Sequence, residues 1–136
     1  MNILVDTDVL IDVALARSAH ADDSVALLDL LERGGARGFV AWHTVSNFFY
    51  LVSATQGAAA TRRFVAELIT FIDIAPTTTT HLRGACQLPF KDFEDAMQVG
   101  AAIACTADCI ATRNVRDFRN SPIPALTPAQ IVVRLA

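Results

Sequence analysis

The sequence has few of the features that mark secreted, membrane-bound or zinc-binding proteins. It contains three cysteines and three histidines, and neither set has the spacing of zinc ligands. No apolar run approaches the ~20 residues that a membrane-spanning helix needs. The N-terminus has Asp6 and Asp8 where a signal peptide would need basic residues followed by a long apolar run. These absences predict a cytoplasmic protein without a membrane segment, in which the thiols stay reduced.

Positive charge is also scarce. Lys91 is the only lysine, and the 136 residues carry a formal net charge of −3. This charge argues against a protein that coats nucleic acid by bulk attraction. It does not argue against a nuclease, because acids gathered around a cation are part of such a site. Arg113, Arg116 and Arg119 stand close together, where they either contact phosphates or lie in solvent.

The 53% apolar composition predicts a well-filled core, and the length predicts one domain spanning residues 1–136. Short apolar runs that suit buried strands alternate with longer segments of helical pattern. We expect strands near residues 3–5, 39–42, 71–74, 109–111 and 125–126. We expect helices near residues 7–16, 22–33, 44–55, 58–70 and 77–86, and others that begin at residues 92 and 128. Such alternation predicts a three-layer α/β/α sandwich with a central, mostly parallel sheet.

Acidic and polar residues collect at one edge of this predicted sheet. Asp6 directly follows the first strand, and residues 112–117 follow the strand at 109–111. In parallel sheets, ligands bind outside the carboxyl ends of the strands. The helix that begins at residue 92 starts near the same edge, because it runs antiparallel to the strand that follows it. The acids at this helix start are Asp92, Glu94 and Asp95.

A cluster of carboxylates is suited to a hard divalent cation. Mg²⁺ prefers octahedral oxygen ligands, and beside a phosphodiester it can polarise the phosphoryl oxygen and activate a water. Acids that approach closely without a cation repel one another, which raises their pKa values. A metal site therefore explains the cluster better than general acid–base catalysis alone.

Each acid also has a structural explanation when it is taken by itself. Asp6 can be a helix N-cap, and acids in a first helical turn interact favourably with the helix dipole. Asp117 can be a simple loop acid. Asp8 and Asp12 are like charges four residues apart on a helix, an arrangement that is tolerated when both face water. The metal-site hypothesis rests on the joint placement of the acids.

Three segments resemble the PIN-domain family: residues 3–10, 92–96 and 110–118. The last, Ile-Ala-Thr-Arg-Asn-Val-Arg-Asp-Phe, is the most specific. Within the family, the chain looks most like the bacterial toxins of VapBC toxin–antitoxin pairs. The resemblance implies a Mg²⁺- or Mn²⁺-dependent endoribonuclease that acts on RNA. It also implies a homodimer and a small antitoxin protein whose tail enters the active-site groove.

The resemblance assigns roles to particular residues. Asp6, Asp95 and Asp117 match acids that bind the metal, while Thr112 and Asn114 match the polar positions that support them. Further acids that could join this ligand set are Glu94 and Asp92.

One residue departs from the family pattern. The family usually has a glutamate in a Thr-x-x-Glu pattern after the second strand, and here Thr44 is followed by Asn47. Asparagine offers a carbonyl oxygen but no charge, so this change predicts weaker metal binding.

Two alternative functions remain open from the sequence. Asn47 favours a catalytically weak PIN domain that binds RNA or a partner protein. An aspartate-nucleophile phosphatase would use Asp6 as the nucleophile and Asp8 as the general acid. That class also needs a lysine and a later Gly-Asp motif, and the sequence offers Lys91 without such a motif.

Overall fold

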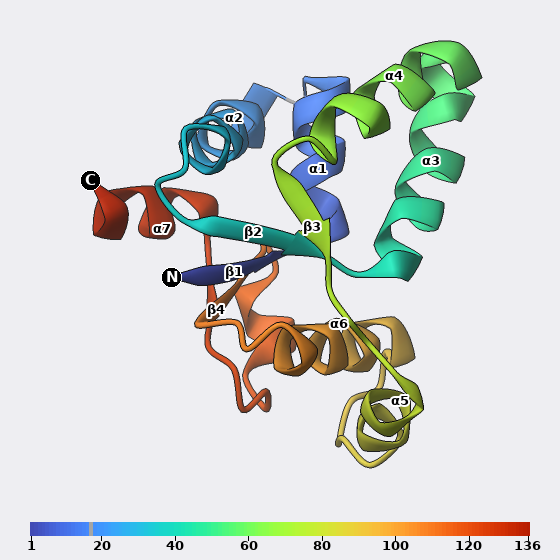
Figure 1. Ribbon diagram of the computed structural model, residues 1–136, viewed down its shortest axis with the longest axis vertical. Helices are drawn as coiled ribbons and strands as arrows, with labels where there is room; N and C mark the ends of the chain where they lie inside the picture. Colours follow the sequence, from blue (N-terminus) through green and yellow to red (C-terminus); the bar gives the residue numbers. More distant parts are fainter. Residues whose placement is uncertain (17) are drawn as a thin grey trace.

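The computed structural model describes residues 1–16 and 18–136 and is built around a five-stranded sheet (Figure 1). The strands are β1 (Asn2–Val5), β2 (Arg37–Val40), β3 (Ile72–Ile74), β4 (Cys109–Ala111) and β5 (Ala125–Leu126). Their order is β3-β2-β1-β4-β5, and every pairing is parallel. Leu4 of the central strand β1 lies opposite Phe39 of β2 and Ile110 of β4.

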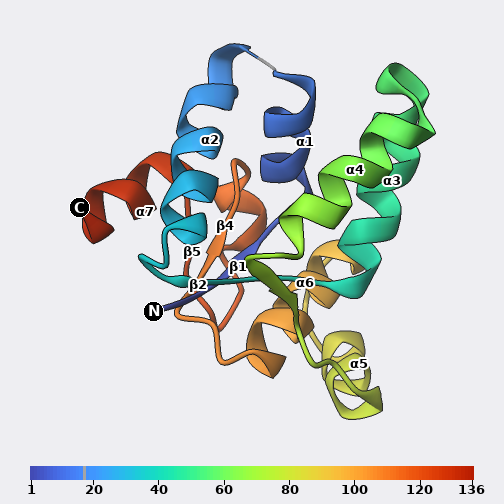
Figure 2. The same ribbon diagram turned by 45° about the horizontal axis from the view of Figure 1, so that its top comes forward.

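Helices cover both faces of this sheet. They are α1 (Thr7–Leu15), α2 (Ser18–Glu32), α3 (Trp42–Gln56), α4 (Ala58–Leu68), α5 (Thr79–Cys86), α6 (Phe93–Ala104) and α7 (Pro128–Leu135), with a 3₁₀ turn η1 (Val115–Phe118). Figures 1 and 2 show α1 to α4 on one side of the sheet and α5 and α6 on the other. The predicted α/β/α sandwich with a parallel sheet is therefore confirmed.

Alternation along the strands divides the core into two clusters. Ile3 and Val5 of β1 are fully buried against the α1, α2 and α3 side, while Leu4 is buried against α6. Successive side chains of a strand point to opposite faces, so a short apolar run without polar interruption suits a strand that is covered on both sides.

Some predicted boundaries were wrong by a few residues. The second strand was expected to reach Trp42, but it ends at Val40, and Trp42 begins α3 with 72% of its surface exposed. A large apolar residue at an exposed helix start mimics the end of a buried strand. Helix α2 begins at Ser18, earlier than the expected residue 22. Val25 of this helix is 40% exposed, whereas Leu27 is fully buried.

Two glycines occupy backbone conformations that other residues rarely adopt. Gly34 has φ 80° just after α2, and Gly57 has φ 87° between α3 and α4. Without a Cβ atom, glycine adopts positive φ at little cost, so these residues end the helices where the sequence predicted.

Within residues 1–16 and 18–136, no helix is both long and apolar enough to cross a bilayer. All three cysteines are free thiols, and two of them, Cys105 and Cys109, are buried.

Candidate functional site

Asp6 occupies the centre of the carboxyl edge of the sheet. It follows the central strand β1 and is the N-cap of α1, with its Oδ1 accepting a 2.8 Å hydrogen bond from the Thr7 N–H. Its own N–H donates to the Ala111 carbonyl at the end of β4. The residue is only 8% exposed. Its position thus agrees with the capping role, yet a cap alone does not require burial of the carboxylate.

Side chains from two remote segments fix the Asp6 carboxylate. Gln98 of α6, which is fully buried, donates from Nε2 to Asp6 Oδ1 at 3.0 Å and to Thr44 Oγ1 of α3 at 2.8 Å. The buried Thr112 hydroxyl, just past β4, donates to Asp6 Oδ2 at 2.8 Å. A carboxylate has about four acceptor positions. Oδ1 accepts two bonds and Oδ2 accepts one, so one acceptor position stays open on Oδ2.

Asp8 lies in the first turn of α1, two residues after Asp6, and accepts hydrogen bonds from the loop after β4. Its Oδ2 accepts from the Arg113 N–H at 3.3 Å and from the Asn114 side-chain amide at 3.0 Å. The Asn114 N–H in turn donates to Thr112 Oγ1 at 3.0 Å. Asp8 Oδ1 is buried and has no hydrogen-bond partner among the described residues. This oxygen is a second open acceptor beside Asp6.

Asp12 is fully buried, which contradicts the expectation that Asp8 and Asp12 both face water. Its Oδ2 lies 2.7 Å from Arg113 Nε, and the Arg113 side chain is 26% exposed. The like charges at positions 8 and 12 are tolerated because Arg113 reaches both residues, the first through its backbone and the second through its guanidinium. Arg113 is therefore a structural partner of acids and does not extend toward a phosphate.

The acids at the start of α6 have different surroundings. Asp92 is the N-cap, and its Oδ1 accepts from the N–H groups of Glu94 and Asp95 at 2.8 and 3.4 Å. Glu94 is exposed and faces His43 of α3 closely enough to influence its pKa. Asp95 is partly buried and lies within electrostatic range of Asp6, Asp8 and Asp117. Of the three acids, Asp95 is the one that lies close to the acids at the edge of the sheet.

Asp117 lies in the 3₁₀ turn η1 and is exposed. Together with Asp92 and Asp95 it lines a hollow of about 420 Å³. The basic residues on the wall of this hollow are Lys91, Arg116 and Arg119. Of the three clustered arginines, the two that are not paired with Asp12 thus stand beside the acids.

The proximity of these acids raises their pKa values. Burial and then the charge of Asp8 raise the pKa of Asp6 to about 7, against the lowering effect of the bonds from Thr112 and Thr7. Burial and then the charges of Asp92 and Asp117 raise the pKa of Asp95 to about 6. Burial also raises the pKa of Asp8, and the Arg113 charge opposes that shift. A cation among these carboxylates would offset both burial and repulsion.

The donor set fits a hard divalent ion in its chemistry. Open acceptor positions remain on Asp6 Oδ2 and Asp8 Oδ1. Asp95 lies within electrostatic range of Asp6, Asp8 and Asp117. Among residues 1–16 and 18–136, however, no three acidic, histidine or cysteine side chains are already close enough to share one ion. Mg²⁺ usually keeps several waters and binds through one or two carboxylates, so Asp6 and Asp8 suffice as its first protein ligands.

Asn47 is partly buried on α3, one turn beyond Thr44. Its neighbour Thr44 belongs to the bonded group around Asp6, but Asn47 is not among the residues that bond to the Asp6 carboxylate. Helix α3 thus contacts the site through Thr44, and Asn47 lies one turn further along the helix.

No role in the site was predicted for Gln98 or Thr7, and Asp8 was not expected in the metal site. A signal for Gln98 did exist, because it is the one strongly polar residue in the Ala-rich inner face of α6, between Ala96 and Val99. Nothing in the sequence indicated that its amide would reach a residue 92 positions away.

Comparison with known proteins identifies the family of the chain. Residues 2–116 match the sequence pattern of the PIN domain. None of the curated proteins matches the chain in sequence.

Three solved structures share the fold at low sequence identity. VapBC2 from Rickettsia felis, bound to a DNA fragment from its promoter, aligns with a TM-score of 0.73 at 15% identity, covering 93% of this chain and 98% of that one. VapC20 from Mycobacterium tuberculosis aligns at 0.63 and 15%, covering 79% and 86%. FitAB bound to the IR36 DNA fragment aligns at 0.65 and 19%, covering 93% and 95%.

Proposed function

The chain belongs to the PIN domain family, and from this premise we propose that it is a divalent-metal-dependent endoribonuclease, the toxin of a toxin–antitoxin pair. The substrate is RNA, and the metal is Mg²⁺ or Mn²⁺. The proposal includes a small antitoxin protein as partner and a homodimeric assembly. It places the protein in the cytoplasm, as one domain over residues 1–136.

The observation that carries the proposal is the buried Asp6 carboxylate, which lies within electrostatic range of Asp8 and Asp95 and has a pKa raised to about 7. Keeping acids together in this way is unfavourable unless something offsets their charge. A structural N-cap would be stabilised equally well at the surface, where water solvates its carboxylate. The arrangement is therefore better explained by a bound cation than by helix capping.

The named residues divide into those that hold the ion and those that hold the ligands. Asp6, Asp95 and Asp117 would hold the ion together with Asp8, whose Oδ1 has no hydrogen-bond partner among the described residues. Glu94 and Asp92 are further candidate ligands. Thr112 and Gln98 orient Asp6, and Asn114 orients Asp8. When bound, the ion polarises the phosphoryl oxygen and activates the attacking water.

The basic residues beside the acids contribute to substrate binding. Arg116, Arg119 and Lys91 line the hollow that contains Asp95 and Asp117. Arginine binds phosphate oxygens through a fork of N–H donors. These side chains hold the RNA backbone so that one phosphodiester reaches the acids, which would otherwise repel it.

Two solved structures with this fold support the biological side of the proposal. VapC20 is a sarcin–ricin loop cleaving toxin. VapBC2 was solved bound to DNA from its own promoter. An RNA-cleaving toxin with a partner that binds DNA is therefore the arrangement that we propose for this chain.

The test is cleavage of structured RNAs with Mn²⁺ by the wild-type chain, by an Asp6→Asn variant and by an Asp22→Asn control. Asp22 is an exposed acid on α2. We expect Asp6→Asn to lower the cleavage rate by at least about 100-fold, since even changes beside metal ligands cost about 10- to 100-fold. The control should cut like wild type. Equal cleavage by all three proteins would contradict the proposed site.

A second candidate function rests on Asn47. A PIN domain with a weakened metal site acts as a module that binds RNA or an antitoxin without cutting. Absence of cutting on every RNA, together with retained binding of RNA or antitoxin, would favour this reading. Membership of the PIN domain family argues against the aspartate-nucleophile phosphatase.

A further inference from the structure

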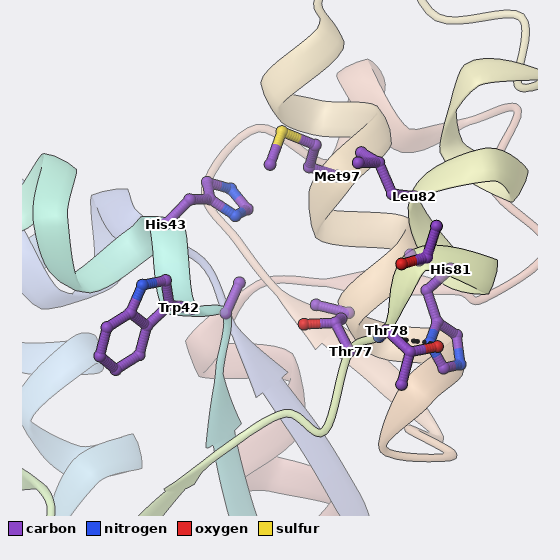
Figure 3. Close-up of a pocket in the computed structure, with 11 residues that line it drawn as sticks. Trp42, His43, Thr77, Thr78, His81, Leu82 and Met97 are labelled. Carbon is purple, nitrogen blue, oxygen red and sulfur yellow. Dashed lines mark hydrogen bonds between the residues drawn. The ribbon is translucent and has the colours of Figure 1, made fainter.

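A second hollow lies on the other side of α6 from the acid-lined one. It has a volume of about 260 Å³ and is formed by the start of α3, the loop before α5, and helices α5 and α6. Its walls include Trp42, His43, Thr77, Leu82 and Met97. Figure 3 shows His43 pointing from α3 toward Met97, with the Trp42 indole beside it on the α3 side and Thr77 across the opening.

This hollow adjoins the bonded group around Asp6. His43 precedes Thr44, whose hydroxyl accepts from Gln98, and Met97 precedes Gln98 on α6. Glu94 lies close enough to His43 to raise its pKa, against the larger lowering effect of burial. A ligand that occupied the hollow would therefore lie near the hydrogen-bonded group that holds Asp6.

The hollow offers one polar atom that the fold leaves unused. His43 Nε2 is buried and has no hydrogen-bond partner among the described residues. A buried polar atom without a partner is costly, and a ligand that supplies one gains that interaction. Rotation about the Cβ–Cγ bond of histidine is soft, so the ring can turn toward such a ligand at little cost. The other histidine on the wall, His81, already accepts from the Thr78 N–H at 3.0 Å through Nδ1.

The shape and chemistry fit a flat heterocycle. A volume of 260 Å³ is below the roughly 300–1,000 Å³ of pockets for drug-sized ligands, so it suits one ring system. Unstacked RNA bases are recognised by aromatic stacking combined with hydrogen bonds to the base edge. Trp42 is 72% exposed at the rim, and Leu82 and Met97 provide apolar walls.

We propose that this hollow binds one unstacked base of the RNA substrate, next to the scissile phosphodiester. The apolar walls of Leu82 and Met97 contact the faces of the base, and His43 Nε2 bonds to its edge. The Trp42 indole, which Figure 3 shows turned away from Met97, lies at the rim beside it. The substrate assignment rests on the proposed ribonuclease function. Binding of the base gives the enzyme a sequence preference near the cut, which the acids alone cannot provide because they contact only the sugar–phosphate backbone.

Trp42 makes the proposal testable without cleavage, because it is the only tryptophan of the chain. The probes are short oligoribonucleotides that carry one base among abasic positions, each of the four bases in turn, with a fully abasic oligonucleotide as the blank. They are titrated into the full chain in EDTA, which prevents metal-dependent cutting. We expect saturable quenching of Trp42 emission, with at least one base bound about 10-fold more tightly than the blank.

Three variants separate recognition from folding. His43→Phe keeps an aromatic ring but removes Nε2, and we expect it to weaken binding of the preferred base by about 10-fold and to reduce the difference between bases. His43→Gln restores a polar group and should keep the preference. His20→Phe, the same change at an exposed histidine on α2, should behave as wild type. Thermal melting followed by circular dichroism checks that each variant is folded.

The outcomes of this experiment are distinct. Equal quenching by the abasic blank, or an unchanged base order in folded His43→Phe, would overturn the proposal. The proposal would also be overturned if Trp42 emission changed only with protein concentration, because a second copy of the chain would then cover the hollow. A change in emission only on addition of an antitoxin peptide would overturn it as well. Base-dependent quenching without any metal-dependent cutting would leave the base site standing and remove the ribonuclease. Metal-dependent cutting without base preference or quenching would support the ribonuclease and overturn the base site.

Discussion

The acids around the carboxyl edge of the sheet form two groups that differ in how firmly the fold holds them. The inner group belongs to the segment that joins β1 to α1, and its members are Asp6, Asp8 and Asp12. The outer group belongs to the start of α6 and to η1, and its members are Asp92, Glu94, Asp95 and Asp117. Inner acids are largely buried and bonded to remote segments, whereas most outer acids are exposed.

This difference indicates how the site is assembled. Asp6 and Asp12 are held by Gln98, Thr112 and Arg113 without any ion. Within residues 1–16 and 18–136, no side chain bonds to the carboxylates of Asp95 and Asp117, and these acids do not form a three-ligand cluster with Asp6. In the proposed metal site, the inner group would be the preformed part, and the outer group would complete it when a cation neutralises the repulsion between the two groups.

The largest expected effect is on the pH dependence of stability. The raised pKa of Asp6, about 7 when folded against 3.8 in the unfolded chain, means that the folded protein favours the protonated acid. This contribution to stability is complete below pH 4 and is lost as the pH rises toward 7. In EDTA, the free energy of unfolding of Asp6→Asn, measured relative to that of the wild type, should therefore rise by about 4 kcal/mol between pH 4 and pH 7.5. Urea denaturation across this range measures the difference.

A difference that stays constant with pH would show that Asp6 is ionised in the folded chain without a cation. The inner group would then be no more costly than the outer one, and the contrast between the groups would fail. The same titration of Asp22→Asn, which changes an exposed acid, provides the baseline.

The ion pair between Arg113 and Asp12 gives the next largest effect. Arg113→Ala removes a 2.7 Å contact to a fully buried carboxylate. Breaking a buried pair from one side costs about 3–5 kcal/mol, and the partial exposure of Arg113 favours the lower end, about 3 kcal/mol. Arg116→Ala, a matched change at an exposed arginine of the next turn, should stay within about 0.5 kcal/mol. Equal unfolding midpoints in urea for both variants would mean that this pair does not hold the inner group.

Gln98→Leu tests the link between α6 and Asp6. The change keeps a similar size but removes the donor to Asp6 and Thr44, which leaves buried acceptors with fewer partners. We expect a loss of about 2 kcal/mol in stability and a 10- to 100-fold loss of cleavage. Measured Mn²⁺ affinity should fall together with cleavage. A variant that unfolds and cuts as the wild type does would show that Asp6 needs no support from α6.

The smallest effect is a gain. Asn47→Glu restores the charge that the family pattern has at this position, and we expect Mn²⁺ to bind about 10-fold more tightly, which corresponds to about 1.4 kcal/mol. Ser46→Glu adds the same charge at the exposed neighbouring residue of α3 and serves as the control. Isothermal titration calorimetry compares the two. Identical affinities in both variants would place residue 47 outside the ion site and sharpen the division into inner and outer acids.

Much of the fold was predictable because the relevant signals are local. Strand β4, strand β5 and the Pro128 start of α7 lie where the sequence placed them. The second strand was predicted too long because Trp42, an apolar residue, is exposed. Sequence periodicity assumes that apolar side chains face inward, so it fails at such positions. The family assignment came from motifs and was confirmed.

The sequence by itself determined the alternation of strands and helices, and with it the edge of the sheet to which Asp6 and residues 112–117 belong. Only the tertiary structure decided that Gln98 bonds to Asp6, that Arg113 pairs with Asp12, and that a hollow opens beside His43. The first kind of information depends on the order of residues along one segment. The second depends on which side chains from distant segments meet, and that is fixed only when the helices pack onto the sheet.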